Sequence, residues 1–201
     1  MVTRQMKSWL ILLWFVSSSS LAIADEPSLI AGRDLPHYES LLQSDDRTVR
    51  LRAVKTLGAF GEAAASVLTE ALEHDDPAVR YTAAVHLGRI GGDGLGRAVD
   101  QLVKMRNDSS SLAGQQAAAF ALCRAGKVDE QLSLLVERLA YPERAMACSA
   151  AELIGMIGPP AASAIETLQQ VKRDNPPSGK GDYHLGGAAG HAIHKLKSDP
   201  H

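Results

Sequence analysis

The stretch Asp75–Gly91, which reads DDPAVRYTAAVHLGRIG, decides the fold of this chain. Its apolar residues recur at the spacing of one helical face: Val79, Ala83, Leu87 and Ile90. Asp76 is a favourable N-cap, and Pro77 fits the first helical position, where a backbone N–H is not needed. Gly91 follows the apolar stripe and is expected to end the helix in a left-handed conformation. The stretch therefore predicts a capped amphipathic helix over 77–90.

Related tails occur four more times along the chain, so this stretch is one unit of a repeat. The alanines that open the matching tails lie 30, 35, 32 and 38 residues apart: Ala53, Ala83, Ala118, Ala150 and Ala188. Each tail is preceded by a second segment with helical spacing, and no segment alternates with period two. A repeat of roughly 20–50 residues built from helices indicates a solenoid. We predict an all-α solenoid of about five helical pairs, without a sheet.

Each repeat is expected to hold a first and a second helix. The first helices are predicted at 37–43, 63–73, 95–106, 128–140 and 160–173. The second helices are predicted at 47–60, 77–90, 111–125, 143–157 and 183–197. The repeat domain then spans 37–197, with repeats at about 37–61, 62–91, 94–126, 128–158 and 160–197. A linker at 25–36 precedes it, and a tail at 198–201 follows.

The composition excludes several classes of protein. The chain has 201 residues, of which 45% are apolar and 22% charged, an ordinary balance for a globular protein. Two cysteines are too few for a disulfide scaffold or a Cys-rich metal framework. Cys123 and Cys148 fall at positions about 10 Å apart along neighbouring second helices, so we expect two free thiols. No apolar run reaches the roughly 18–20 residues of a membrane helix.

The first 24 residues follow the pattern of a secretory signal peptide. A short basic start precedes the apolar run 9–16, and Ala22 and Ala24 form a small-x-small cleavage site. We predict a signal peptide at 1–24, cleavage after Ala24, a secreted or periplasmic location and no stable membrane insertion afterwards. Retention as an uncleaved anchor is the alternative. Cleavage removes two basic residues and changes the formal net charge from −2 to −4, which argues against a nucleic-acid partner.

Charge is distributed unevenly between the two sets of helices. The second helices carry ten Lys or Arg and two acids. The first helices, counted over 36–43, 62–73, 95–106, 128–140 and 160–173, carry six Lys or Arg and nine acids. A face lined by second helices would therefore attract an acidic partner. Equivalent positions of successive repeats form rows across this face, and one row reads Ala59, Arg89, Arg124, Met156 and His194.

Arginine and aromatic side chains dominate the centres of protein interfaces, and these rows contain both. The candidate partner-binding residues are Arg52, Lys55, Tyr81, His86, Arg89, Phe120 and Arg124. The alternative is that these side chains are structural, with Phe120 in the core.

The tail Val79-Arg80…Ala83-Ala84…Leu87-Gly88…Ile90-Gly91 resembles HEAT repeats of the short bacterial kind, also called phycobilisome-lyase-like HEAT repeats. The resemblance covers roughly 37–197. It implies a right-handed superhelix with the first helices on the convex side and the second helices on a concave, partner-binding side. It also implies a ladder of ion pairs between repeats: Asp45 with Arg50 and Asp75 with Arg80. Gln115 and Ala147 stand where the next arginines would be, so this ladder should stop halfway.

No catalytic motif occurs in the sequence. His184, His191 and His194 could share one helix face, but two intervening glycines weaken that helix, and a surface histidine cluster is favoured over a metal site. The glycines of 92–96 follow a helix and lack a GK[ST] ending, so they indicate an inter-repeat turn and not a phosphate loop. We expect no enzymatic activity, no cofactor and no bound metal.

These observations predict an exported, non-catalytic, monomeric scaffold that binds another protein with an acidic surface on its concave face. The alternative is an accessory subunit of a secreted hydrolase or a bilin-lyase-like enzyme, because phycobilin lyases share the repeat and similar arrays occur with secreted bacterial hydrolases. The export signal and the lack of an evident chromophore pocket argue against the lyase.

Overall fold

The computed structural model describes residues 27–108, 110–178 and 181–198. This part of the chain is helical, and its extended backbone pairs only at an isolated bridge between Ile30 and Arg33. The predicted all-α architecture without a sheet is confirmed for it. The predicted signal peptide at 1–24, the start of the linker and residues 199–201 of the tail lie outside the described residues.

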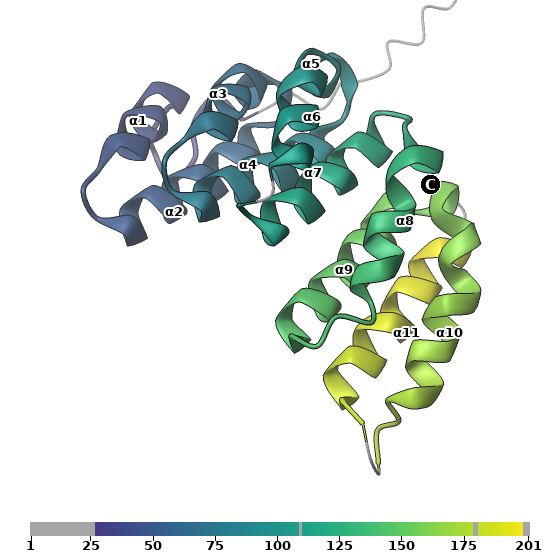
Figure 1. Ribbon diagram of the computed structural model, residues 1–201. Coiled ribbons are helices and arrows are strands. Elements are labelled where there is room, and N and C mark those ends of the chain that lie inside the picture. The colour runs from purple at the N-terminus through teal and green to yellow at the C-terminus, as the bar shows by residue number, and fades with distance from the viewer. Residues whose placement is uncertain (1–26, 109, 179–180, 199–201) are drawn as a thin grey trace, which may run out of the picture.

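Five helical pairs follow one another, as the repeat spacing predicts (Figure 1). The first helices, several of them extended by 3-10 turns, are α1 (Leu35–Ser40), α3 (Ala65–Glu70), α5 (Gly92–Arg97) with α6 (Val99–Asn107), α8 (Val128–Arg138) and α10 (Ile165–Asp174). The second helices are α2 (Arg47–Leu57), α4 (Pro77–Ile90), α7 (Leu112–Arg124), α9 (Arg144–Ile157) and α11 (Tyr183–Lys197).

The glycines of 92–96 lie inside the helix α5, so the prediction of an inter-repeat turn at these residues is wrong.

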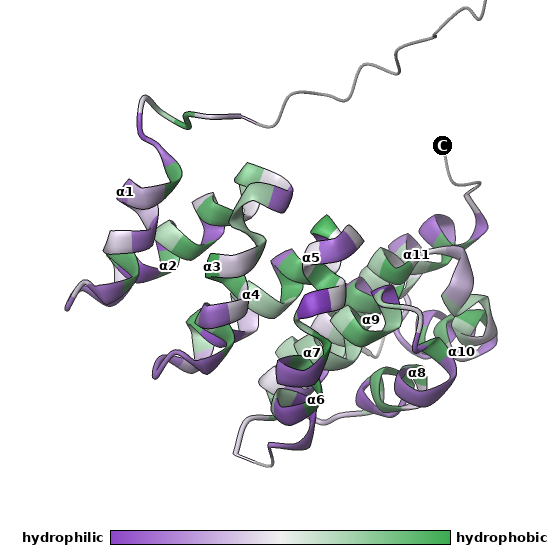
Figure 2. Ribbon diagram, turned by 90° about the horizontal axis from the view of Figure 1, so that it is seen from above, coloured by the Kyte–Doolittle hydropathy of each residue, from purple (hydrophilic) through white to green (hydrophobic). Residues whose placement is uncertain are grey.

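The α-solenoid bends at α7 into two arms (Figure 1). The first helices lie along the outer edge of the bend, and the second helices lie along its inner side. In Figure 2 the second helix α9 is mostly hydrophobic, whereas the first helix α6 carries a long hydrophilic stretch. The placement of second helices on the inner side agrees with the expectation from the family resemblance.

Each arm has its own hydrophobic core, and α7 contributes to both. Its residues Ala117, Ala118, Ala121 and Leu122 belong to the core of the N-terminal arm. Its residues Ala119, Phe120 and Cys123 belong to the core of the C-terminal arm. Small alanine side chains allow neighbouring helices to approach α7 from both sides, so α7 is buried along most of its length.

The caps of the second helices are those that the sequence predicts. The Asp76 carboxylate accepts a hydrogen bond from the Ala78 amide at 2.9 Å, and Pro77 occupies the first helical position. Gly91 ends α4 with a positive φ of 72°, but its ψ of −146° is not the left-handed helical value that we expected. This conformation is still one that glycine adopts without strain.

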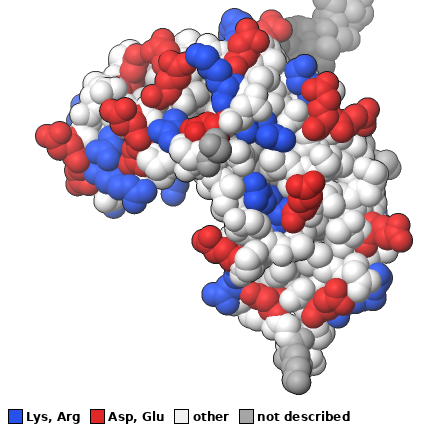
Figure 3. Space-filling model, in the orientation of Figure 1, with Lys and Arg blue, Asp and Glu red and all other residues white. Residues whose placement is uncertain are grey.

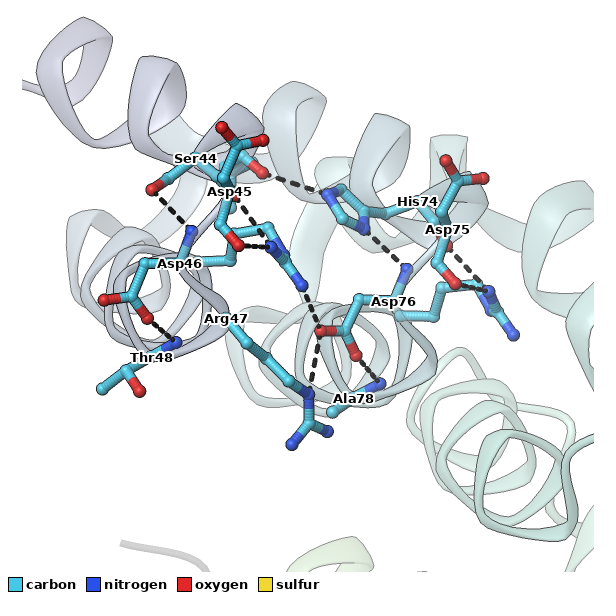
Figure 4. A network of polar contacts seen from close by, with 12 residues as sticks. Ser44, Asp45, Asp46, Arg47, Thr48, His74, Asp75, Asp76 and Ala78 are labelled. Atoms are coloured by element: carbon cyan, nitrogen blue, oxygen red, sulfur yellow. Dashed lines mark hydrogen bonds and ion pairs between the residues drawn. The ribbon is translucent and has the colours of Figure 1, made fainter.

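The expected ion pairs of Asp45 with Arg50 and of Asp75 with Arg80 are wrong (Figure 4). Each arginine instead donates to the backbone carbonyl of the corresponding aspartate, at 3.0 Å in both repeats. The turn before each second helix points its carbonyls toward the guanidinium group and leaves the carboxylates of Asp45 and Asp75 exposed.

The carboxylate that joins two repeats is that of Asp76. It accepts hydrogen bonds from Arg50 at 3.0 Å and from Arg47 at 3.1 Å, both of which belong to the preceding repeat. Within the described residues Arg80 forms no ion pair, and Gln115 accepts a hydrogen bond from Arg138 instead. Among the described residues, the contact of Asp76 with Arg47 and Arg50 therefore stands in place of the expected ladder and is not repeated in the next repeat.

Candidate partner-binding groove

The C-terminal ends of four second helices border a groove of about 500 Å³. Its lining residues come from α4, α7, α9 and α11 and from the chain next to them: Arg89, Arg124, Gly155, Met156, Pro159, His191, His194, Lys195 and Ser198. Four members of the row predicted from equivalent positions are among them, namely Arg89, Arg124, Met156 and His194. Stacking of the repeats thus brings together side chains that are up to 105 positions apart in the sequence.

A smaller hollow of about 360 Å³ adjoins this groove at Arg89, which lines both. Lys55, Gly58 and Ala59 of the first repeat line it, together with His86 and Ile90 of α4. We call the two hollows together the C-terminal rim groove. It runs across all five repeats, from the end of α2 to the end of α11.

The basic side chains of the rim groove lack acidic partners. Arg89 and Lys195 are exposed and form no ion pair within the described residues. No described Asp or Glu lines either hollow. The helix C-termini beneath carry partial negative charge that offsets part of this potential. The groove nevertheless presents positive charge without a bound carboxylate, which suits an acidic ligand.

Arg124 holds three second helices together at the centre of the groove. Its Nε donates to the carbonyl of Gly88 at 3.1 Å, and its Nη1 lies 3.5 Å from the carbonyl of Ile157. These contacts fix the guanidinium between α4 and α9. Its Nη2 makes no hydrogen bond within the described chain, so Arg124 has both a structural role and free donors for a ligand.

His86 contributes a neutral imidazole to the smaller hollow. Burial lowers the pKa of His86, and the positive charges of Arg89 and Lys55 lower it further. The ring packs over Gly58, where a Cβ atom would collide with it. The uncharged ring offers one donor and one acceptor at neutral pH, and it adds no positive charge to the groove.

Phe120 is not a partner-binding residue, and its prediction as one is wrong. Its side chain is completely buried in the core of the C-terminal arm. The ring packs against Gly88 of α4, where a Cβ atom would lie only 2.6 Å from it. Because Gly88 has no side chain, there is space for the Phe120 ring. The alternative prediction, that Phe120 lies in the core, is therefore the correct one.

Tyr81 lies away from the rim groove and uses its hydroxyl within the protein. The hydroxyl is 2.9 Å from Oγ of Ser149, so it joins α4 directly to α9 across α7. The Tyr81 hydroxyl is therefore engaged in a contact between two second helices.

Arg52 lines a third hollow of about 520 Å³ on α1 and α2, which Lys55 also borders. The predicted set thus separates: Lys55, His86, Arg89 and Arg124 share the rim groove, and Arg52 is adjacent. The candidate list omits three further groove residues, Lys195, His191 and His194. His194 stands in the row read from the sequence, and its helical spacing to His191 and Lys195 was the signal that could have found the other two.

The thiols and histidines form no further centre in the described chain. Both cysteines are free, as predicted, and burial raises the pKa of Cys123 to about 12, which keeps its thiol protonated and unreactive. Among the described residues, no three His, Cys, Asp or Glu side chains converge to hold a metal ion. None of the described helices is long and apolar enough to cross a membrane.

Comparisons with known proteins support the fold. Residues 35–123 match the family model of HEAT repeats. No curated protein gives a match. An engineered protein of the Northeast Structural Genomics Consortium is 21% identical with a TM-score of 0.50, covering 81% of this chain and 79% of its own. The complex of CpcE and CpcF of phycocyanin lyase from Nostoc sp. PCC7120 is 23% identical with a TM-score of 0.51, covering 90% of this chain and 70% of that chain.

At these identities the likeness to solved structures shows the fold alone. The family match covers the first three repeats, and the structural likeness extends over most of the chain. The predicted fold is therefore confirmed: this chain is an α-solenoid, and its residues 35–123 match HEAT repeats.

Proposed function

We propose that this protein is a non-catalytic scaffold that is exported and binds another protein through the inner side formed by its second helices. The observation that carries the proposal is the C-terminal rim groove, in which equivalent positions of successive repeats meet and leave their basic groups unpaired. A solenoid presents such a surface preformed, so binding requires little ordering of the protein. HEAT repeats in general mediate protein interactions, which fits this function.

Site-specific photo-cross-linking tests the proposal. A benzophenone side chain is placed at Lys55 or Arg89 on the inner side and, as matched controls, at Lys104 of α6 or Arg173 of α10, which are exposed on outer helices. Cells of the source organism are irradiated, and the adducts are identified by mass spectrometry. We expect one defined protein to be cross-linked from both inner positions and from neither outer position. Adducts from the outer positions alone, or none from any position, would contradict the proposal.

The export part of the proposal has its own measurement. The intact mass of the protein, recovered from the periplasmic or culture fraction, should correspond to a chain that begins at Asp25. A chain found in the cytosol with residues 1–24 retained would exclude export and leave the binding function untouched.

The same cross-linking identifies the class of partner. If the cross-linked protein is a secreted hydrolase, the alternative function holds and this chain is an accessory subunit of that enzyme.

A further inference from the structure

We infer that the C-terminal rim groove binds an acidic peptide segment, with carboxylates on Arg89, Arg124 and Lys195 and with the peptide's apolar atoms against Met156 and Pro159. This inference rests on the proposed function and gives the chemistry of the ligand that the groove accepts. Three independent features of the groove support it.

The first feature is the arrangement of charge. Arg89 comes from α4, Arg124 from α7 and Lys195 from α11, and all three border the same groove. None of the three has a carboxylate within 4.0 Å among the described residues. Some other exposed basic groups of the described chain do have such partners, for example Arg97 with Glu62 and Lys104 with Glu73. The groove therefore lacks the carboxylates that a ligand would supply.

The second feature is the preorganised guanidinium of Arg124. Two backbone carbonyls hold its Nε and Nη1, so the direction of its remaining Nη2 donors is fixed before a ligand arrives. A guanidinium that is already ordered loses little side-chain entropy when it binds a carboxylate.

The third feature is the uncharged floor. Gly155 brings α9 so close to α11 that a Cβ atom at this position would lie 3.0 Å from Cα of Ala192. The floor between the helices is therefore shallow, and Met156 and Pro159 provide apolar surface along it. The β and γ carbons of acidic side chains can pack on such a floor while their carboxylates reach the basic groups at its border.

The surrounding surface favours a peptide over a nucleic acid. A nucleic acid contacts a broad basic surface, because its affinity comes from many phosphates. This chain has a formal net charge of −2. On the face shown in Figure 3, acidic and basic groups are interspersed over the N-terminal arm. A short groove that is lined by basic groups and by no described Asp or Glu suits a short segment of concentrated negative charge.

Fluorescence anisotropy with defined peptides tests the inference. Fluorescein-labelled octaglutamate is titrated with the purified protein at low salt, and octaglutamine of the same length serves as the uncharged probe. We expect saturable binding of octaglutamate and binding at least about tenfold weaker for octaglutamine. Equal binding of the two peptides would overturn the inference. Tighter binding of an eight-residue oligothymidylate would overturn it as well, in favour of a nucleic-acid ligand.

Two charge-reversal variants locate the site. Arg89→Glu with Lys195→Glu changes two exposed groups that have no partner in the described chain, and we expect octaglutamate binding to weaken by about tenfold or more. Lys104→Glu with Arg173→Glu makes the same change in net charge on α6 and α10, and we expect less than about a twofold loss. Equal losses in both variants would show that binding follows net charge alone.

A third variant keeps every cation in place. Met156→Glu introduces a carboxylate on the floor, and it should weaken octaglutamate binding while far-ultraviolet circular dichroism confirms an unchanged helix content. Unchanged binding by this folded variant would contradict a ligand in the groove.

If octaglutamate fails to bind but cross-linking from the inner side succeeds, the scaffold function stands and the acidic ligand is excluded. If octaglutamate binds and no partner is cross-linked, the scaffold function is excluded and the groove chemistry stands.

Discussion

Asp76 joins two repeats through a single carboxylate. One oxygen caps α4 at the Ala78 amide, and the other accepts from Arg47 and Arg50 of the preceding repeat. The Asp76 side chain is 6% exposed, so its removal leaves the partly buried Arg50 without a carboxylate partner. We predict that Asp76→Ala lowers the free energy of unfolding by about 2–4 kcal/mol, measured by urea denaturation.

Asp46→Ala is the matched control for this prediction. Asp46 caps α2 at the Thr48 amide at 2.7 Å, but it is exposed and has no ion pair among the described residues. Loss of the cap alone should cost about 1 kcal/mol. Equal losses in Asp46→Ala and Asp76→Ala would mean that the contacts to Arg47 and Arg50 contribute nothing to stability.

The charge of Asp76 also makes stability depend on pH. Burial raises the pKa of Asp76, but the hydrogen bonds from the Ala78 amide and Arg50 and the positive charge of Arg47 outweigh burial, and the pKa lies below its ordinary value of 3.8. The unfolded chain therefore binds the proton more readily than the folded chain does. The stabilisation is complete above pH 3.8 and is lost as the pH falls through the lower, folded pKa.

Asp76→Asn tests this dependence, because asparagine keeps the cap and removes the charge. We predict that the gap in unfolding free energy between the wild type and Asp76→Asn is constant from pH 7 to about pH 5 and narrows below pH 3.8. A gap that stays constant down to pH 2 would show that the Asp76 charge is not stabilising.

At the scale of the helices, the approach of α4 to α7 depends on Gly88. A Cβ atom there would lie 2.6 Å from the Phe120 ring and 3.1 Å from the backbone of Ala121. The buried ring cannot move away, so Gly88→Ala must push the two helices apart. We predict a loss of about 1–3 kcal/mol in the free energy of unfolding, measured by urea denaturation.

Gly96→Ala in α5 provides the comparison. No atom beyond the local helix backbone lies within 4 Å of a Cβ at Gly96, so the better helix propensity of alanine should leave stability unchanged or raise it by up to about 1 kcal/mol. A similar loss in both variants would show that helix separation is not the cause.

The second helices could be predicted from the sequence because their signals are local. Asp76, Pro77 and the apolar stripe that follows fix α4 without reference to any other repeat. The break between α5 and α6 at Ala98 has no such signal. The burial of Phe120 could not be predicted in this way, because the space for its ring comes from the missing side chain of Gly88, 32 positions away. The spacing of apolar residues does not show which face of a buried helix meets a glycine. The row through Arg89 and Arg124 was predictable because equivalent positions of stacked repeats lie side by side.

Across the whole molecule, the bend at α7 is held on its inner side by hydrogen bonds between second helices of different repeats. The hydrogen bond of Tyr81 to Ser149 joins residues 68 positions apart and passes over the repeat between them. Close by, the buried Gln116 donates to the carbonyl of Met146 at 3.1 Å. The two arms have separate cores, so these contacts and the shared helix α7 set the angle between them.

We predict that Tyr81→Phe widens the distribution of angles between the arms. A hydrogen bond of this kind contributes about 0.5–1.5 kcal/mol, so its loss should raise the population of more open molecules by up to about tenfold. Spin labels at Glu39 of α1 and Arg173 of α10 report the distance between the arms by pulsed electron spin resonance. Cys148 is replaced by serine in all samples, and Cys123 can remain because its buried thiol, with a pKa of about 12, resists labelling.

Tyr38→Phe is the matched control, because it removes a tyrosine hydroxyl whose hydrogen bond to the carbonyl of Ile30, at 2.8 Å, lies within the N-terminal arm. The Tyr81→Phe distribution should be broader than that of the wild type, and the Tyr38→Phe distribution should match the wild type. Equal distributions in all three proteins would mean that α7 alone fixes the bend. The rim groove draws its lining from both arms, so in that case its width would not depend on the Tyr81–Ser149 contact. A broader distribution for Tyr81→Phe would mean that the width of the groove depends on the Tyr81 hydroxyl, which does not line it. The affinity for octaglutamate would then depend on this hydroxyl as well.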